Sequence, residues 1–89
     1  TGFTVQGHAH RPFAPDLAGE LLALNLSGSD ELHRCALAAN AVARAYADVV
    51  DALLQAGATP ASAVRAVGAH GQTVRHRPGE FDGTGYTVQ

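Results

Sequence analysis

The sequence contains no lysine. All six basic residues are arginines, and eight carboxylates outnumber them, which gives a formal net charge of −2 over 89 residues. A chain without lysine offers neither the lysine of a phosphate-binding P-loop nor an amine for a Schiff base. The small excess of carboxylates also argues against a basic surface that would neutralise nucleic-acid phosphates. We therefore exclude lysine chemistry and expect no nucleic-acid partner.

Cysteine and long apolar runs are also scarce. The single cysteine, Cys35, permits neither an internal disulfide nor a multi-cysteine metal site. Its place on an apolar helical stripe predicts a buried, inert thiol. No apolar run approaches the roughly 18 residues of a membrane span, and no signal-like segment opens the chain. We therefore expect a cytoplasmic protein without a membrane partner.

The length allows one small domain, residues 1–89. A chain of this size buries only about 60% of the surface that its unfolded form exposes, which leaves little room for a deep catalytic cleft. The chain begins without methionine, and its last residues, 86–89, alternate like a strand that has been cut short. We expect a piece of a longer protein.

The first third of the sequence predicts a strand and a short helix. Residues 1–10 alternate between apolar and polar side chains, as in a half-buried strand. Pro15 is suited to the first position of a helix. One helical face is then formed by Leu17, Leu21 and Leu24, and the helix is expected to end at Asn25.

A longer helix is expected over about residues 30–56. Ser29 is placed to cap it, and Gly57 follows its end. An apolar stripe with the helical repeat predicts that one face lies against a sheet or another helix. The stripe consists of Leu32, Cys35, Ala36, Ala39, Val42, Ala43, Tyr46, Val49, Val50, Leu53 and Leu54. The opposite, solvated face consists of His33, Arg44, Asp48, Asp51 and Gln55.

The last third predicts strands. After a turn at Thr59 and Pro60, the apolar run 64–69 is typical of a buried parallel strand, reached by a right-handed crossover. Residues 74–89 then predict a hairpin, because the breaker-rich stretch 78–83 separates two extended segments. The expected order is strand, helix, helix, strand, strand, an α/β arrangement.

The sequence His70-Gly71-Gln72-Thr73 follows the expected buried strand. Ligands of open α/β sheets bind at the carboxyl ends of strands, and these side chains offer neutral hydrogen-bond donors and acceptors. Glycine also lets a backbone N–H approach a ligand closely. The four residues therefore suit a hydroxyl-rich ligand such as a sugar. The alternative is a purely structural turn, in which the polar side chains satisfy the loop backbone.

Two further sets of polar residues are weaker candidates for a ligand site. His8 and His10 share one face of the expected first strand, but two histidines do not complete a metal site, and we predict none. Arg75, His76 and Arg77 form a small cationic patch that would suit a phosphate or a carboxylate, although solvation is the simpler expectation. No acidic pair stands at an evident strand end, so we name no catalytic residue.

Five segments together resemble the anhydro-N-acetylmuramic acid kinase family and cover nearly the whole chain. They are HRPF at 10–13, ELLALN at 20–25, ELHR at 31–34, VGAHGQTVRHRP at 67–78 and GTGYTVQ at 83–89.

The resemblance implies a fragment of the amino-terminal domain of a two-domain kinase with the RNase H-like, actin-like fold of the sugar kinase, Hsp70 and actin superfamily. It implies a reaction in which ATP, Mg²⁺ and water open the 1,6-anhydro ring of the amino sugar and phosphorylate its 6-position. The family's phosphate loop would precede Thr1, and its catalytic aspartate would follow Gln89. The resemblance implies that His70, Gly71, Gln72 and Thr73 form a sugar-binding or site-shaping element on the sugar side.

We therefore expect a fragment that is inactive alone, binds no cofactor and self-associates. The alternative is a small non-catalytic α/β module whose long helix docks a protein partner.

Overall fold

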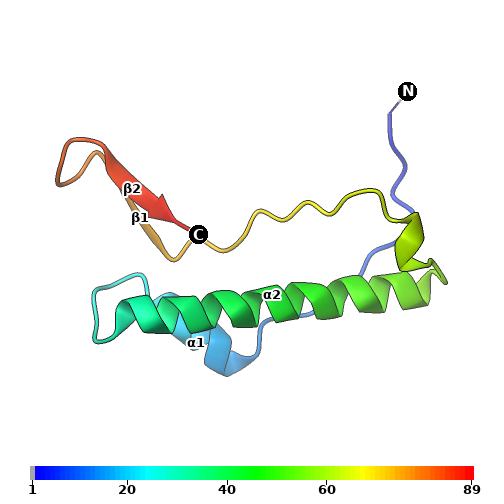
Figure 1. Ribbon diagram of the computed structural model, residues 1–89, viewed down its shortest axis with the longest axis horizontal. Coiled ribbons are helices and arrows are strands. Elements are labelled where there is room, and N and C mark those ends of the chain that lie inside the picture. Colours follow the sequence, from blue (N-terminus) through cyan, green and yellow to red (C-terminus); the bar gives the residue numbers. More distant parts are fainter. Residues whose placement is uncertain (1) are drawn as a thin grey trace.

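The computed structural model describes residues 2–89, which form two helices, one 3₁₀ turn and two strands (Figure 1). In chain order they are α1 (Pro15–Ala23), α2 (Glu31–Ala56), η1 (Ala61–Ala63), β1 (Arg75–Pro78) and β2 (Gly85–Val88). The α/β class is confirmed. The expected order of elements is wrong at its start and in its middle. The first element of residues 2–89 is a helix, and no strand lies between α2 and β1 in that range.

Helix α1 forms where the sequence predicts it and supplies half of the core. Pro15 opens the helix, where its missing N–H costs nothing. Leu21 and Leu24 are 7% and 3% exposed and pack with Ala38 of α2 and with Val74, which precedes β1. The core therefore lies where α1, the first half of α2 and the hairpin meet.

Helix α2 begins and ends within a residue of the prediction, but Ser29 does not cap it. The N-cap residue is Asp30, which has a left-handed backbone (φ 51°) and makes no side-chain capping hydrogen bond. Instead, the carboxylate of Glu31 accepts a hydrogen bond from the N–H of Gly28 at 3.2 Å, which holds the α1–α2 connection from inside the helix. At the far end Gly57 is the C-cap, as predicted.

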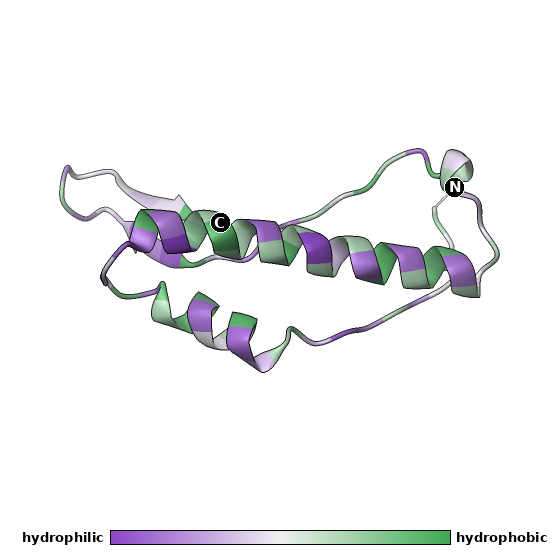
Figure 2. Cartoon of the chain, turned by 60° about the horizontal axis from the view of Figure 1, so that its bottom comes forward, coloured by the Kyte–Doolittle hydropathy of each residue, from purple (hydrophilic) through white to green (hydrophobic). Residues whose placement is uncertain are grey.

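The apolar stripe of α2 is covered only in part. Ala38 is buried, and Cys35 and Val42 pack against the core, whereas Leu32 on the same stripe is 85% exposed. Ala36, Ala39 and Ala43 are exposed as well. The prediction that the whole stripe lies against another element is therefore wrong, and Figure 2 shows apolar residues along α2 beyond the region that α1 covers. The polar face is exposed as predicted.

Two of the predicted strands are absent from the described residues. Residues 2–14 and 64–74 form no strand, and Thr1 lies outside the described residues. A strand needs a neighbour that pairs with its N–H and C=O groups, and residues 2–13 and 65–73 make no backbone–backbone pair, whereas the N–H of Val74 donates to the carbonyl oxygen of Val88. Val67, predicted to be buried, is 68% exposed. The segment that carries Val67 instead runs back along α2 toward the hairpin (Figure 1).

The carboxyl-terminal hairpin is confirmed. Strands β1 and β2 pair antiparallel, from Arg75 opposite Val88 to Pro78 opposite Gly85. The N–H of Gly79 donates to the carbonyl oxygen of Thr84 at 2.9 Å and closes the loop. Inside the loop, the Asp82 carboxylate accepts hydrogen bonds from the N–H groups of Gly85 and Thr84, both at 2.9 Å, and these bonds lower the pKa of Asp82.

Candidate functional site

The candidate turn, His70 to Thr73, joins the extended segment to the hairpin. Gly71 has a φ of +74°, in the left-handed region that glycine adopts without strain. The side chains of His70 and Gln72 are exposed, whereas Gly71 and Thr73 are half-buried. No buried strand precedes the turn among residues 2–89. The turn lies beside the middle of α2 and not at the end of a central strand.

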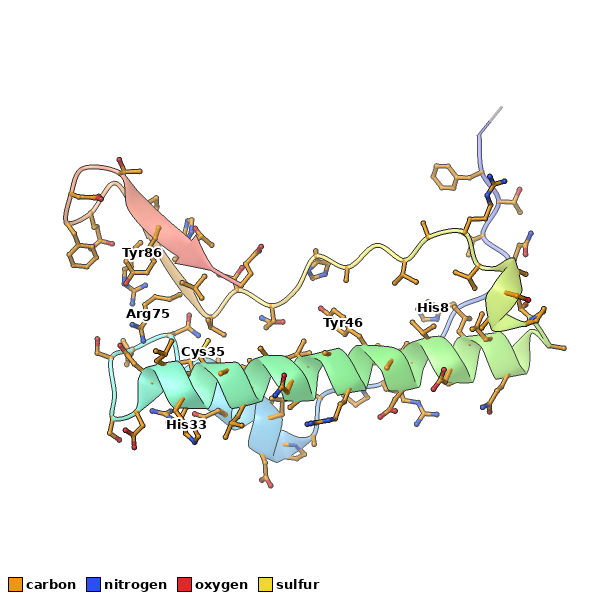
Figure 3. The ribbon with its side chains drawn as sticks, in the orientation of Figure 1. His8, His33, Cys35, Tyr46, Arg75 and Tyr86 are labelled. Carbon is orange, nitrogen blue, oxygen red and sulfur yellow. The ribbon has the colours of Figure 1, made fainter. Side chains whose placement is uncertain are left out.

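Two side chains from distant parts of the chain hold this turn. The hydroxyl of Tyr46, in the middle of α2, donates to the carbonyl oxygen of Gly71 at 3.1 Å. The side-chain amide of Gln89 donates to the hydroxyl oxygen of Thr73 at 3.1 Å. Figure 3 shows Tyr46 rising from α2 toward the extended segment. The turn is therefore fixed to the long helix on one side and to the chain end on the other.

The two exposed polar side chains of the turn line different cavities. Gln72 lines a cavity of about 230 Å³ between α2 and the hairpin, together with Gln89 and Val74. His70 lines a separate hollow of about 480 Å³, beside His10 and Arg11. Tyr46 lines both. The structure therefore does not bring His70 and Gln72 to one point, and the residue common to the two sides is Tyr46.

The cationic patch of β1 is not simply solvated, which corrects the prediction. Arg75 is 14% exposed at its side chain and donates to the carbonyl oxygens of Leu24 (2.8 Å) and Leu26 (2.9 Å) and to the carboxylate of Glu31 (2.9 Å). Arg77 donates to the carbonyl oxygen of Asn25 at 2.6 Å. Both arginines thus bind the α1–α2 connection and are not free for a ligand anion.

Hydrogen bonds of this kind shift the pKa of the carboxylates involved. The hydrogen bond from Arg75, with a second from the N–H of Gly28, lowers the pKa of Glu31. In the same way, the guanidinium of Arg34 binds the carboxylate of Glu20 and lowers its pKa. The Arg34–Glu20 pair joins α2 to α1, and the Arg75–Glu31 pair joins β1 to the first turn of α2.

The remaining candidates show no catalytic arrangement. His8 and His10 lie in the extended amino-terminal segment, and among residues 2–89 no three His, Cys, Asp or Glu side chains are placed to hold a metal ion. Cys35, predicted to be buried, is half-buried. No helix in the described part of the chain is long and apolar enough to cross a membrane.

Sequence reasoning missed the residues that hold the turn. The sequence pattern places Tyr46 only on an apolar stripe and Gln89 in a strand. A signal existed for Tyr46, because a buried tyrosine hydroxyl needs a hydrogen-bond partner. No local pattern indicates that the partner is a glycine 25 positions away.

The comparisons with known proteins name a family. The sequence model of the family described as anhydro-N-acetylmuramic acid kinase matches residues 2–89. The chain belongs to this family.

Curated relatives are similar along most of the chain. A protein of Variovorax paradoxus named anhydro-N-acetylmuramic acid kinase is 60% identical over 85 residues, which are 96% of this chain and 23% of the relative. Proteins of the same name from Albidiferax ferrireducens and Bordetella petrii are 59% and 63% identical over 96% and 88% of the chain. The chain spans about a fifth of the length of these relatives. No solved structure matches it.

Proposed function

We propose that the chain is part of the amino-terminal domain of an anhydro-N-acetylmuramic acid kinase with the RNase H-like, actin-like fold, and that it acts in cell-wall recycling in the cytoplasm. The whole enzyme uses ATP and water to open the 1,6-anhydro ring of the sugar and to phosphorylate its 6-position. The observation that carries the proposal is the family match over residues 2–89, with about 60% identity to relatives of that name. The same match favours the kinase over a free-standing interaction module.

Within this enzyme, His70, Gly71, Gln72 and Thr73 contact the sugar. The turn supports this role because Tyr46 holds its backbone at Gly71 and Gln89 holds the Thr73 side chain, while the side chains of His70 and Gln72 stay exposed. A fixed backbone with free polar side chains is what a ligand-binding loop requires. The donors and acceptors are neutral, as suits hydroxyl and N-acetyl groups.

The described residues do not fit ATP or Mg²⁺. They include no lysine and no metal-binding group of His, Cys, Asp or Glu among residues 2–89, and the arginines nearest the turn in sequence, Arg75 and Arg77, are bound to backbone carbonyl oxygens. We therefore derive no step of the phosphoryl transfer through these residues. The proposal assigns them the sugar side, and the isolated 89-residue chain should show no ATP-dependent phosphorylation of the sugar.

The test is a substitution in the full-length kinase. Gln72→Ala should lower kcat/KM for the sugar by about 10- to 100-fold if the amide is paired in the complex, with the KM for ATP within about twofold. The matched control is Gln55→Ala, because Gln55 is an exposed glutamine on the polar face of α2.

Three results would count against the proposal. A wild-type enzyme that does not phosphorylate the sugar would overturn the activity. Weakened use of ATP alone would overturn the sugar-side assignment. An unchanged reaction with a lower melting temperature would leave the turn a structural element.

A further inference from the structure

The peptide group between Gly71 and Gln72 is oriented by a single side chain. The hydroxyl of Tyr46 donates to the carbonyl oxygen of Gly71 at 3.1 Å, and Tyr46 is itself half-buried in α2. Peptide groups are planar, and none of the described ones is cis. In a trans peptide the C=O and the N–H point in opposite directions. The bond from Tyr46 therefore directs the N–H of Gln72 away from α2.

The N–H of Gln72 is the feature of this peptide group that a ligand can use. Among residues 2–89, no backbone or side-chain acceptor receives a hydrogen bond from the N–H of Gln72. The N–H groups of His70, Gly71 and Thr73 also have no partner among residues 2–89, but no hydrogen bond to a carbonyl oxygen holds the peptide groups that carry them. The turn thus offers one donor of fixed direction beside the exposed side chain of Gln72.

Glycine makes the orientation dependent on Tyr46. The orientation of the Gly71–Gln72 peptide group is set by ψ of Gly71 and φ of Gln72, and a residue without a Cβ places little restriction on its own ψ, so the glycine does not fix this peptide group. A Cβ at this position would meet only the Cβ of Gln89, at an ordinary 3.6 Å, so the surroundings of the Gly71 Cα are open. The hydrogen bond from Tyr46 is the contact that selects one orientation.

We propose that Tyr46 is a positioning residue of the sugar site, which holds the Gly71–Gln72 peptide so that the N–H of Gln72 donates to an oxygen of the bound amino sugar. The inference rests on the proposed function, because it takes the sugar to lie against this turn. The sugar then accepts a hydrogen bond from the backbone N–H of Gln72 in addition to the side-chain contacts. Tyr46 of α2 supports this bond without touching the sugar.

The hydrogen bond is tested by NMR on the 89-residue chain. Gly71–Gln72 is the one Gly-Gln pair in the sequence, so ¹³C-carbonyl glycine with ¹⁵N glutamine labels that single peptide. Tyr46→Phe should move the Gly71 carbonyl resonance upfield, because the carbonyl loses its donor. Tyr86→Phe makes the same change at the second tyrosine of the chain and should leave the resonance in place. An unmoved resonance in Tyr46→Phe overturns the proposal.

The consequence is tested by kinetics of the full-length kinase. Tyr46→Phe should raise the KM for the sugar about three- to tenfold, the range expected for one lost neutral hydrogen bond, and should leave the KM for ATP within about twofold. Tyr86→Phe should change neither. If the wild type is active and Tyr46→Phe keeps its KM for the sugar, or shows only a lower melting temperature, the positioning role is wrong. If the wild type is inactive, the proposed function fails and the sugar role of Tyr46 fails with it, whereas the carbonyl resonance still decides whether Tyr46 holds the turn.

Discussion

The guanidinium of Arg75 lies 2.9 Å from a carboxylate oxygen of Glu31, although 44 positions separate the two residues. The same guanidinium donates to the carbonyl oxygens of Leu24 and Leu26. Carbonyl oxygens at the end of a helix lack partners within it, and Leu24 is the C-cap of α1. One side chain of the hairpin thus completes the end of one helix and binds the start of the next.

Loss of this side chain should destabilise the fold. Arg75→Gln removes the planar set of donors and leaves the carbonyl oxygen of Leu24, a buried residue, without its partner. We expect a clear decrease in the urea midpoint of unfolding, followed by the circular dichroism of the helices. Arg44→Gln, at an exposed position on the polar face of α2, is the control and should change the midpoint little. Equal midpoints for the two variants would show that Arg75 does not hold the hairpin.

The ion pair of Arg75 and Glu31 should also make the stability of the fold depend on pH in the acid range. The pKa of Glu31 is lowered below 4.5 in the fold, chiefly by the hydrogen bond from Arg75. The unfolded chain therefore binds the proton more readily, so the stabilisation is fully present above 4.5 and is lost as the pH falls through the folded pKa. Between about pH 6 and about pH 3 the urea midpoint of the wild type should fall more than that of Glu31→Gln. Glu20, whose pKa Arg34 lowers, makes a similar contribution in both proteins and so serves as the common background. A parallel fall in the two proteins would exclude Glu31 as a source of the dependence.

Local patterns predicted the elements that depend on local interactions. The spacing of Leu17, Leu21 and Leu24 gave the buried face of α1, and the loop residues 78–83 gave the hairpin. The run 64–69 has the composition of a buried strand, but a strand also needs a paired neighbour, which composition does not reveal. The prediction failed there because no strand of residues 2–89 lies beside the run.

Local patterns likewise predicted only part of the candidate turn. Its residue types predicted a polar turn at Gly71, and the positive φ of that residue is consistent with it. Its location beside α2 and its bonds to Tyr46 and Gln89 depend on contacts between residues distant in sequence. Such contacts follow from the tertiary arrangement, and neither periodicity nor spacing contains them.

The exposed apolar side chains predict self-association of the 89-residue chain. Leu32 and Val67 are both large and exposed, and the two-stranded sheet has unpaired outer edges. We expect the mass in sedimentation experiments to rise with concentration in the micromolar range. Leu32→Asp should shift the chain toward monomer without loss of helix, because an acidic residue suits the first turn of α2. Asn40→Asp adds the same charge at another exposed position of α2 and is the control. A wild type that stays monomeric at high micromolar concentration would contradict the prediction.

Gly85 should be the least replaceable glycine of the hairpin, because it combines a positive φ with close backbone neighbours. At Gly85 (φ +71°) an added Cβ would collide with the carbonyl oxygen of Arg77 and lie 2.7 Å from the nitrogen of Gly79. Both are backbone atoms that the hairpin pairing holds, so neither can move without opening the loop.

Gly79 provides the matched comparison. It has nearly the same φ, +73°, and nothing within 4 Å of an added Cβ. Gly79→Ala should therefore cost only the left-handed backbone conformation, about 1–2 kcal/mol of unfolding free energy. Gly85→Ala has the same unfavourable backbone conformation and also separates the strands, so it should lower the unfolding free energy at least about twice as much. It should also expose the N–H of Gly79 to rapid hydrogen exchange, because the bond to the carbonyl oxygen of Thr84 opens. Equal losses in the two variants, measured by urea unfolding, would mean that the loop adjusts and that the contact at Gly85 does not set the register of β1 and β2.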